Sequence, residues 1–136
     1  MQEPKVSWLD RRIAAPGPFL ALCLSPQEFA QAMRDCSSEQ VPEWVTSGKG
    51  ATMHTLGNHE GKLVCVVCIS GWEGRDPCEV AGLLIHESVH VWQAYCREIG
   101  EREPGDEQEA YGIQSIAQEL MTEFARRLCT QPQPAR

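Results

Sequence analysis

The most constraining feature of this sequence is a long, largely apolar stretch that opens with a helix-starting signature. Residues 76–79 (Asp-Pro-Cys-Glu) supply a capping aspartate, a first-turn proline and a glutamate three residues after the cap, which is typical of a helix N-terminus. The next strong breaker near the end of the apolar stretch is Gly100, so we predict one helix from Pro77 to Ile99. Most of its positions are apolar, and a helix that is apolar nearly all round is expected at the centre of a domain.

Three segments before this helix have local signatures of their own. Residues 19–24 form a short apolar run after a Pro-Gly-Pro turn and predict a strand. Ser25 then begins a second capping pattern, with Glu28 reaching back to the cap, and predicts a helix to about Cys36. Two strand-like runs, 51–56 and 62–70, flank a turn that contains two glycines and predict a β-hairpin.

A second long helix is expected after the glycine-containing break at 100–105. It should run from Asp106, as its N-cap, to about Cys129, and the proline- and glutamine-containing tail 130–136 should be frayed. A chain of 136 residues has the size of one ordinary domain. We therefore predict a single α+β domain over 1–136, in which a small antiparallel or mixed sheet of about three strands packs on two long C-terminal helices and a short N-terminal helix is added.

The seven cysteines indicate reduced thiols. An extracellular disulfide framework favours an even count, whereas this chain has an odd one. Cys65 and Cys68 form a CxxC pattern, but they lie in a predicted strand, where residues three apart point to opposite faces. We therefore expect buried structural thiols in a reducing compartment rather than a metal or redox site.

The charge balance and the apolar runs exclude several classes of partner. A net charge of −7 argues against nucleic acid or an anionic membrane surface, because binding to either needs clustered Lys and Arg. The longest apolar runs, 19–24 and 63–69, are too short to span a bilayer. The N-terminus has mixed charge and lacks a signal-peptide pattern. These features predict a cytoplasmic protein that binds neither nucleic acid nor membrane.

An HExxH pattern lies in the middle of the long apolar helix. His86 and His90 are four residues apart, so they share one helix face, one turn apart, and their imidazoles can hold one ion. Glu87 is rotated about 100° from His86, which lets it reach a metal-bound water without binding the metal tightly. Burying such groups in an apolar helix without a purpose would be costly. We favour a metal site over the alternative, two core histidines bonded to the backbone and a solvent-facing glutamate.

A catalytic zinc usually has three protein ligands and a water. No histidine follows His90, which excludes the HExxHxxGxxH arrangement. His54 and His59 lie upstream, on or beside the predicted hairpin. The remaining candidates are the acids at the start of the second long helix, namely Asp106, Glu107 and Glu109.

This combination resembles the gluzincin branch of HExxH zinc metallopeptidases, in the compact form of bacterial and phage proteins. In that branch a glutamate from a following helix, often placed before a small residue, completes the zinc site. The resemblance covers 77–120 and implies His86, His90 and Glu109 as zinc ligands and Glu87 as general base.

The resemblance also bears on the choice of the third ligand and on the residues that support the histidines. Glu107 is the second choice as ligand, whereas Asp106 is better explained as a helix cap. The family often has an acid four residues after the glutamate ligand, where this chain has Ile113. The histidines must then be supported by the backbone or by another acid.

The resemblance implies zinc-dependent hydrolysis of peptide bonds in a peptide or protein substrate. The general base would take a proton from a zinc-activated water and pass it to the leaving amine. Tyr111 is our first choice as donor to the oxyanion, although a place in the core between the helices is as good an explanation for it. Tyr95 and His54 are weaker choices. The substrate should pair with a sheet edge, for which the strand 62–70 is the candidate.

Two other classes of function are compatible with the same residues. One is a catalytically inactive, zinc-binding relative that acts as a binding protein. The other is a metal-free interaction domain whose helix only resembles the motif. The intact Glu87 favours the enzyme over both.

Overall fold

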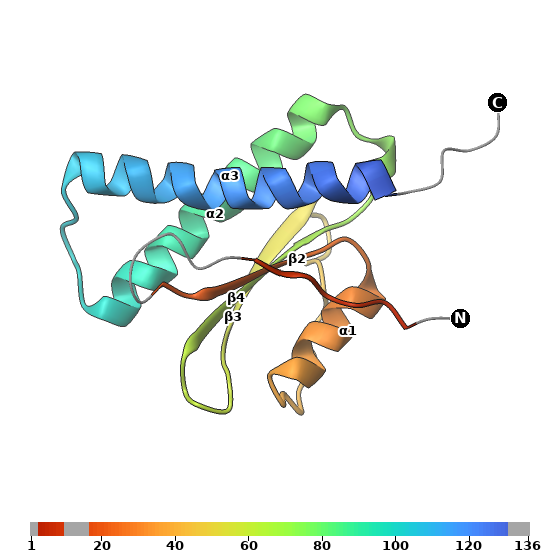
Figure 1. Cartoon of the computed structure of the whole chain (residues 1–136), viewed down its shortest axis with the longest axis horizontal. Coiled ribbons are helices and arrows are strands. Elements are labelled where there is room, and N and C mark those ends of the chain that lie inside the picture. Colours follow the sequence, from red (N-terminus) through yellow and green to blue (C-terminus); the bar gives the residue numbers. More distant parts are fainter. Residues whose placement is uncertain (1–2, 10–16, 131–136) are drawn as a thin grey trace.

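The computed structural model describes residues 3–9 and 17–130, so most of the predicted tail lies outside the described residues. In this part of the chain a four-stranded sheet is combined with three α-helices (Figure 1). The α+β class predicted from the sequence is confirmed. The elements are β1 (Trp8–Leu9), β2 (Phe19–Cys23), α1 (Pro26–Asp35), β3 (Ala51–Gly57), β4 (Leu63–Ile69), the 3-10 turn η1 (Trp72–Gly74), α2 (Pro77–Ile99) and α3 (Asp106–Thr130).

The sheet is mixed, with the strand order β1-β2-β4-β3. β4 pairs in parallel with β2 and antiparallel with β3, so the predicted hairpin is confirmed and its second strand is internal. The prediction that the strand 62–70 offers a free edge to a substrate is therefore wrong. The edge strand beside α2 is β3, which lies at the end of the strand order next to β4.

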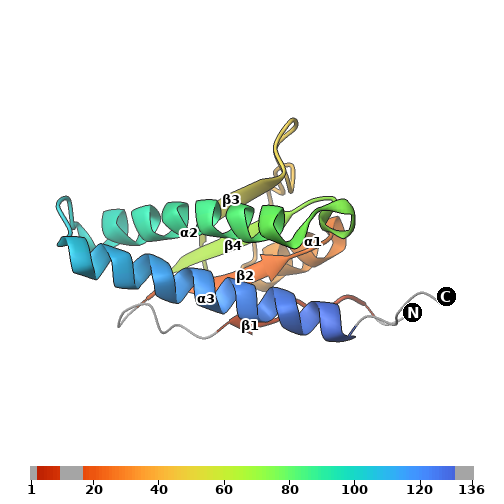
Figure 2. The same ribbon diagram turned by 90° about the horizontal axis from the view of Figure 1, so that it is seen from above.

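Helices cover both faces of the sheet. α2 and α3 pack on one face, with α2 against β3 and β4 and α3 against β2, while α1 packs on the other face (Figure 2). The alternation along β4 divides its side chains between two cores: Cys65, Val67 and Ile69 face the long helices, and Val64, Val66 and Cys68 face α1. The two CxxC sulfurs thus diverge as predicted, and both cysteines are free and buried.

The two N-terminal caps predicted from the sequence are present, with one change of partner. The Ser25 hydroxyl accepts the Glu28 N–H at 3.2 Å, and the Asp76 carboxylate accepts the Cys78 N–H at 2.7 Å. The Glu28 carboxylate, however, is held by Arg127, at 2.5 and 2.8 Å, rather than reaching back to the backbone of its own helix. A nearly buried carboxylate gains more from a bidentate guanidinium than from one neutral N–H. This pair ties the end of α3 to the start of α1.

The ends of the long helices follow local chain geometry. α2 stops at Gly100, which has a left-handed φ of 74°, and its boundaries are those predicted. α3 begins one residue earlier than expected, because Asp106 is already helical. The carbonyl of Gly105 accepts the Glu109 N–H at 2.9 Å, so Gly105 and not Asp106 is the N-cap. Thr130, predicted to be part of the frayed tail, is still in α3. None of the described helices is long and apolar enough to cross a membrane.

α2 and α3 approach closely where Trp92 lies over Gly112. A Cβ atom at Gly112 would be 2.2 Å from the Trp92 ring, so only glycine leaves room for the indole. Both residues are buried. This contact sets how the two long helices pack beside each other.

Candidate active site

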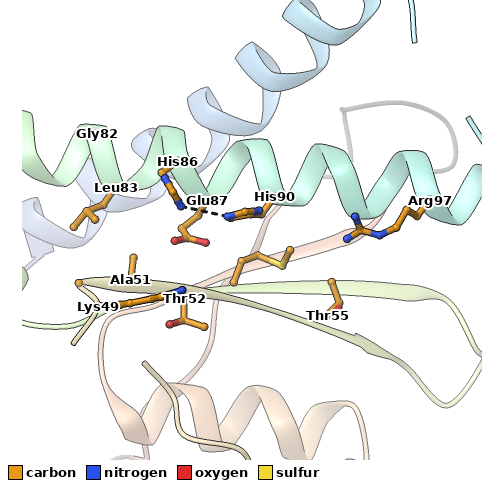
Figure 3. Close-up of a pocket in the computed structure, with 12 residues that line it drawn as sticks. Lys49, Ala51, Thr52, Thr55, Gly82, Leu83, His86, Glu87, His90 and Arg97 are labelled. Carbon is orange, nitrogen blue, oxygen red and sulfur yellow. Dashed lines mark hydrogen bonds between the residues drawn. The ribbon is translucent and has the colours of Figure 1, made fainter. Parts of the chain in front are cut away.

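A cleft of about 640 Å³ lies between α2 and the edge strand β3 (Figure 3). The HExxH residues point into it from α2, and the opposite wall comes from the segment that leads into β3 and from β3 itself. The pairing of β3 with β4 therefore positions one wall, and the packing of α2 on the sheet positions the other. The lining residues are Lys49, Gly50, Ala51, Thr52, Met53, Thr55, Gly82, Leu83, His86, Glu87, His90 and Arg97.

The two histidines face each other at the cleft. Their Nε2 atoms are 3.2 Å apart, and both side chains are exposed. Two nitrogen ligands on one tetrahedral zinc ion, each about 2.05 Å from it, would be separated by about 3.3 Å. The observed spacing therefore fits two ligands of one ion.

Gln93 contacts the ring of His90 from the next turn of α2. Its side-chain oxygen lies 3.1 Å from Nδ1 of His90 and can only accept a hydrogen bond, so the contact favours the tautomer with the proton on Nδ1. In this structure the Nε2 lone pair of His90 then accepts a hydrogen bond from Nε2 of His86, and a metal would take the place of that proton. Gln93 supports the orientation of the His90 ring as a second partner, as metal-bound histidines require. The support of His90 thus comes from a side-chain amide, and the prediction that it would come from the backbone or another acid is wrong for this histidine. The spacing of three residues on one helix was the signal for this contact.

Glu87 lies beneath the two histidines and is only 4% exposed. Among the described residues, none donates a hydrogen bond to its carboxylate, and its oxygens reach the cleft that it lines. The alternative of core histidines and a solvent-facing glutamate is therefore wrong. The two histidines are exposed, and the glutamate is buried. The expectation of a helix buried all round is also wrong: one flank of α2, with both histidines, is open to solvent.

Glu109 is not brought to the histidines in this structure. Its carboxylate accepts the indole N–H of Trp92 at 3.0 Å, and it lines a separate pocket of about 500 Å³. Trp92 is two residues after His90, so it projects about 200° away around the helix. Asp106 and Glu107 are exposed and do not line the cleft either. Within 3–9 and 17–130, no cluster of three or more His, Cys, Asp or Glu side chains is arranged to hold a metal, and the third ligand stays a prediction.

None of the three residues considered as oxyanion donor lines the cleft. Tyr111 is 64% exposed on α3, so it is not part of the core between the helices either. Tyr95 is buried against the Trp92 ring. His54 belongs to the opposite face of β3, where its Nε2 lies 2.8 Å from the Trp44 carbonyl and its ring stacks on Phe29 at 4.6 Å.

The upstream histidines thus play no part in the cleft. His54 is engaged on the α1 side of the sheet, and His59 lies in the hairpin turn between β3 and β4, beside a different pocket. The sequence indicated neither Lys49 nor Arg97 as site residues. Lys49 and Arg97 line the same cleft because α2 packs against β3. No local sequence pattern reveals that packing.

The backbone of β3 leaves a row of polar groups free at the cleft. Ser70 N–H donates to the Gly50 carbonyl at 3.1 Å, which makes 50 and 70 a hydrogen-bonded pair of the antiparallel ladder. Hydrogen-bonded pairs alternate along such a ladder, so the N–H and C=O groups of Ala51, Met53 and Thr55 point away from β4. These groups can pair with an added strand.

The site therefore combines a histidine pair with metal-ligand spacing, a buried carboxylate that has no hydrogen-bond donor within 3–9 and 17–130, and the edge strand β3. Such an arrangement can hold a divalent metal and an extended chain in one cleft. Comparison with known proteins adds no assignment, because no family, no curated protein and no solved structure matches this chain. The chemistry is therefore argued from the geometry of the cleft.

Proposed function

We propose that this protein is a zinc-dependent peptidase in which His86 and His90 bind the metal and Glu87 is the general base. The observation that carries the proposal is the 3.2 Å separation of the two Nε2 atoms directly above the unpartnered Glu87 carboxylate. Two neutral imidazoles at this spacing suit zinc. A bound zinc would lower the pKa of its water to about 7 and polarise a substrate carbonyl.

Glu87 can do the proton transfer that peptide hydrolysis needs. Its carboxylate faces the cleft beside the histidines and has no protein partner among the described residues to hold it in another orientation. It would accept a proton from the attacking water and deliver it to the amine nitrogen of the leaving peptide. Burial of the carboxylate keeps bulk water from competing for the proton.

The free edge of β3 can hold the substrate. A peptide in extended conformation would pair with the outward backbone groups of Ala51, Met53 and Thr55, and its carbonyls would then pass in front of the histidine pair. Backbone pairing needs no particular side chains. It therefore accounts for binding and orientation, and selectivity must come from other residues of the cleft.

Glu109 remains our candidate for the third protein ligand, a role for which it must leave the Trp92 indole. Its present position favours a second candidate function: a domain that binds peptides, with or without zinc, and does not hydrolyse them. The two functions differ in whether a complete metal site forms.

The test is metal content together with hydrolysis. Purified protein incubated with zinc and desalted should contain about one zinc per chain by mass spectrometry of the metal, and His86→Ala and His90→Ala should each lose most of it. Glu87→Gln should keep the zinc and lose cleavage of a degenerate peptide mixture. His59→Ala is the matched control, because this histidine lies outside the cleft.

Three results would contradict the proposal in different ways. Absence of zinc from the wild-type protein would remove the metal site. Zinc binding without cleavage of any peptide would favour the binding domain. Cleavage that persists in Glu87→Gln would show that the general base is another group.

A further inference from the structure

The charges that line the cleft differ from those of the chain as a whole. The protein has a net charge of −7, yet apart from Glu87 the two charged side chains in the cleft are both cations, Lys49 and Arg97. They lie at opposite ends of it, Lys49 before β3 and Arg97 near the C-terminal end of α2 (Figure 3). The cleft therefore suits a ligand that carries negative charge.

Arg97 has no bonded partner, unlike most arginines in the described part of the chain. Arg75 donates to the Ser70 carbonyl, Arg126 pairs with Glu123, and Arg127 pairs with Glu28. The Arg97 guanidinium makes neither an ion pair nor a hydrogen bond with any described residue, although Glu98 and Glu101 are close in sequence. Its five N–H donors are free for a ligand.

The position of Arg97 relative to the histidines gives a distance along the substrate. It follows His90 by seven residues, which is two helical turns, so both side chains project from the same flank of α2 and line the same cleft. Seven residues of helix advance by about 10 Å. An extended peptide covers that length in about three residues.

We propose that Arg97 is a specificity-determining residue that binds a carboxylate of the substrate about three residues from the bond at the histidine pair. This inference rests on the proposed peptidase function, because it assumes that a peptide lies along β3. A guanidinium binds a carboxylate through two parallel N–H bonds, which fixes the register of the peptide as well as its charge. Lys49 adds a point charge at the other end of the cleft and strengthens the attraction.

The carboxylate can come from an acidic side chain or from the C-terminus of the peptide. Both present the same two oxygens to Arg97. An acidic side chain would select a sequence inside a longer chain, whereas a terminal carboxylate would restrict the enzyme to the end of its substrate. Two arms of one binding experiment distinguish these sources.

The experiment measures peptide binding to zinc-loaded Glu87→Gln protein by fluorescence anisotropy, so that no cleavage occurs. The first arm uses acetylated, amidated eight-residue peptides with one glutamate moved through every position and glutamine in the matched peptides. The second arm compares free-acid and amidated forms of peptides that contain no acidic side chain. We expect a glutamate at one or two adjacent positions, or the free acid, to bind about three- to tenfold more tightly than its neutral match at low salt.

Substitution of Arg97 should remove this preference and leave neutral peptides unaffected. Arg97→Met keeps the length of the side chain without its charge, and Arg97→Lys should restore part of the effect. Arg34→Met is the matched control, because this exposed arginine lies on α1, on the opposite face of the sheet. Circular dichroism would verify that each variant is folded.

The outcomes separate this inference from the proposed function. If peptides bind and the wild-type enzyme cleaves them but Arg97→Met leaves the preference for acidic peptides unchanged, or if no such preference exists, the role of Arg97 is wrong and the peptidase stands. If no peptide of either arm binds, both are overturned.

Discussion

The Nε2 atoms of His86 and His90 lie 3.2 Å apart on the flank of α2 that neither the sheet nor α3 covers. Glu87 projects from the adjacent flank toward the sheet and is nearly buried. One turn of helix therefore presents two nitrogen donors to an open cleft and holds a carboxylate behind them. This division of exposed and buried groups is what a metal site with a protected base requires.

Gln93 should tune metal affinity without touching the metal. Gln93→Leu removes the acceptor of the His90 Nδ1–H, so the ring loses its fixed orientation and tautomer. We expect zinc affinity to fall by about 10- to 100-fold, measured by competition with a chromogenic chelator. Gln118→Leu, at an exposed glutamine on α3, should leave it unchanged, and an unchanged affinity in Gln93→Leu would show that Gln93 does not support a metal-binding His90.

Glu109 provides the test of the third ligand. If it binds zinc, Glu109→Gln should lower the affinity by roughly a hundredfold or more, beyond the effect of a supporting residue. Glu98→Gln is the control, because this exposed glutamate on α2 does not line the cleft. Trp92→Phe removes the indole N–H that holds the Glu109 carboxylate, so it should preserve or raise zinc affinity at some cost in stability. Equal affinities for Glu109→Gln and the wild type would exclude this residue as a ligand.

Gly112→Ala should destabilise the packing of α2 on α3. The added Cβ would lie 2.2 Å from the Trp92 ring, and overpacking of this kind costs about 1–3 kcal/mol, partly offset by the better helix propensity of alanine. Gly82→Ala on α2 meets nothing within 4 Å and should instead stabilise by up to about 1 kcal/mol. Urea denaturation would measure both, and equal midpoints would contradict the close approach.

The ion pair between Glu28 and Arg127 should stabilise the α1–α3 corner. Glu28 is nearly buried, so Arg127→Met leaves a carboxylate with only the Ser25 hydroxyl as a side-chain donor. Because the Arg127 side chain retains some exposure, we expect a loss of about 2 kcal/mol rather than the larger cost of a fully buried pair. The double variant Glu28→Gln with Arg127→Met should recover part of this loss in the same urea measurement. No recovery would contradict coupling between the two residues.

The cysteines should divide into two groups by reactivity. Cys78 and Cys129 are exposed and should be alkylated quickly by iodoacetamide at pH 8. Burial raises the pKa of Cys65 from its usual value of about 9 to about 12, and a hydrogen bond with Cys23, together with burial, raises the pKa of Cys68. Both should react only on unfolding, as counted by mass spectrometry.

The raised pKa values of these thiols predict that the free energy of unfolding falls at high pH. Below pH 9 both states keep the thiols protonated, so the thiols contribute no pH dependence. Above pH 9 the unfolded chain loses these protons while folded Cys65 keeps its proton until about pH 12, and stability falls by about 1.4 kcal/mol per pH unit for each such thiol. Cys65→Ala should show a shallower decline between pH 9 and pH 11, and an unchanged decline would contradict the assignment.

The sequence by itself determined the helices and the spacing of the motif. The cap at Asp76, the left-handed stop at Gly100 and the four-residue separation of His86 and His90 act within a few residues of chain. Local hydrogen bonds and helical periodicity decide such features, so the boundaries of α2 and the shared face of the histidines could be predicted. The divergence of Cys65 and Cys68 followed in the same way from the two-residue period of a strand.

Only the tertiary structure decided which groups meet. Three features depend on segments far apart in the sequence: the free edge at β3, the partner of Glu28 and the partner of Glu109. Local sequence patterns do not predict such contacts. Arg97 became a site residue because α2 packs along the free edge of β3, and Glu109 turned to Trp92 because α3 crosses α2 at Gly112. Packing between distant elements chooses among many locally equivalent partners, which is why the histidine pair could be foreseen and the rest of the cleft could not.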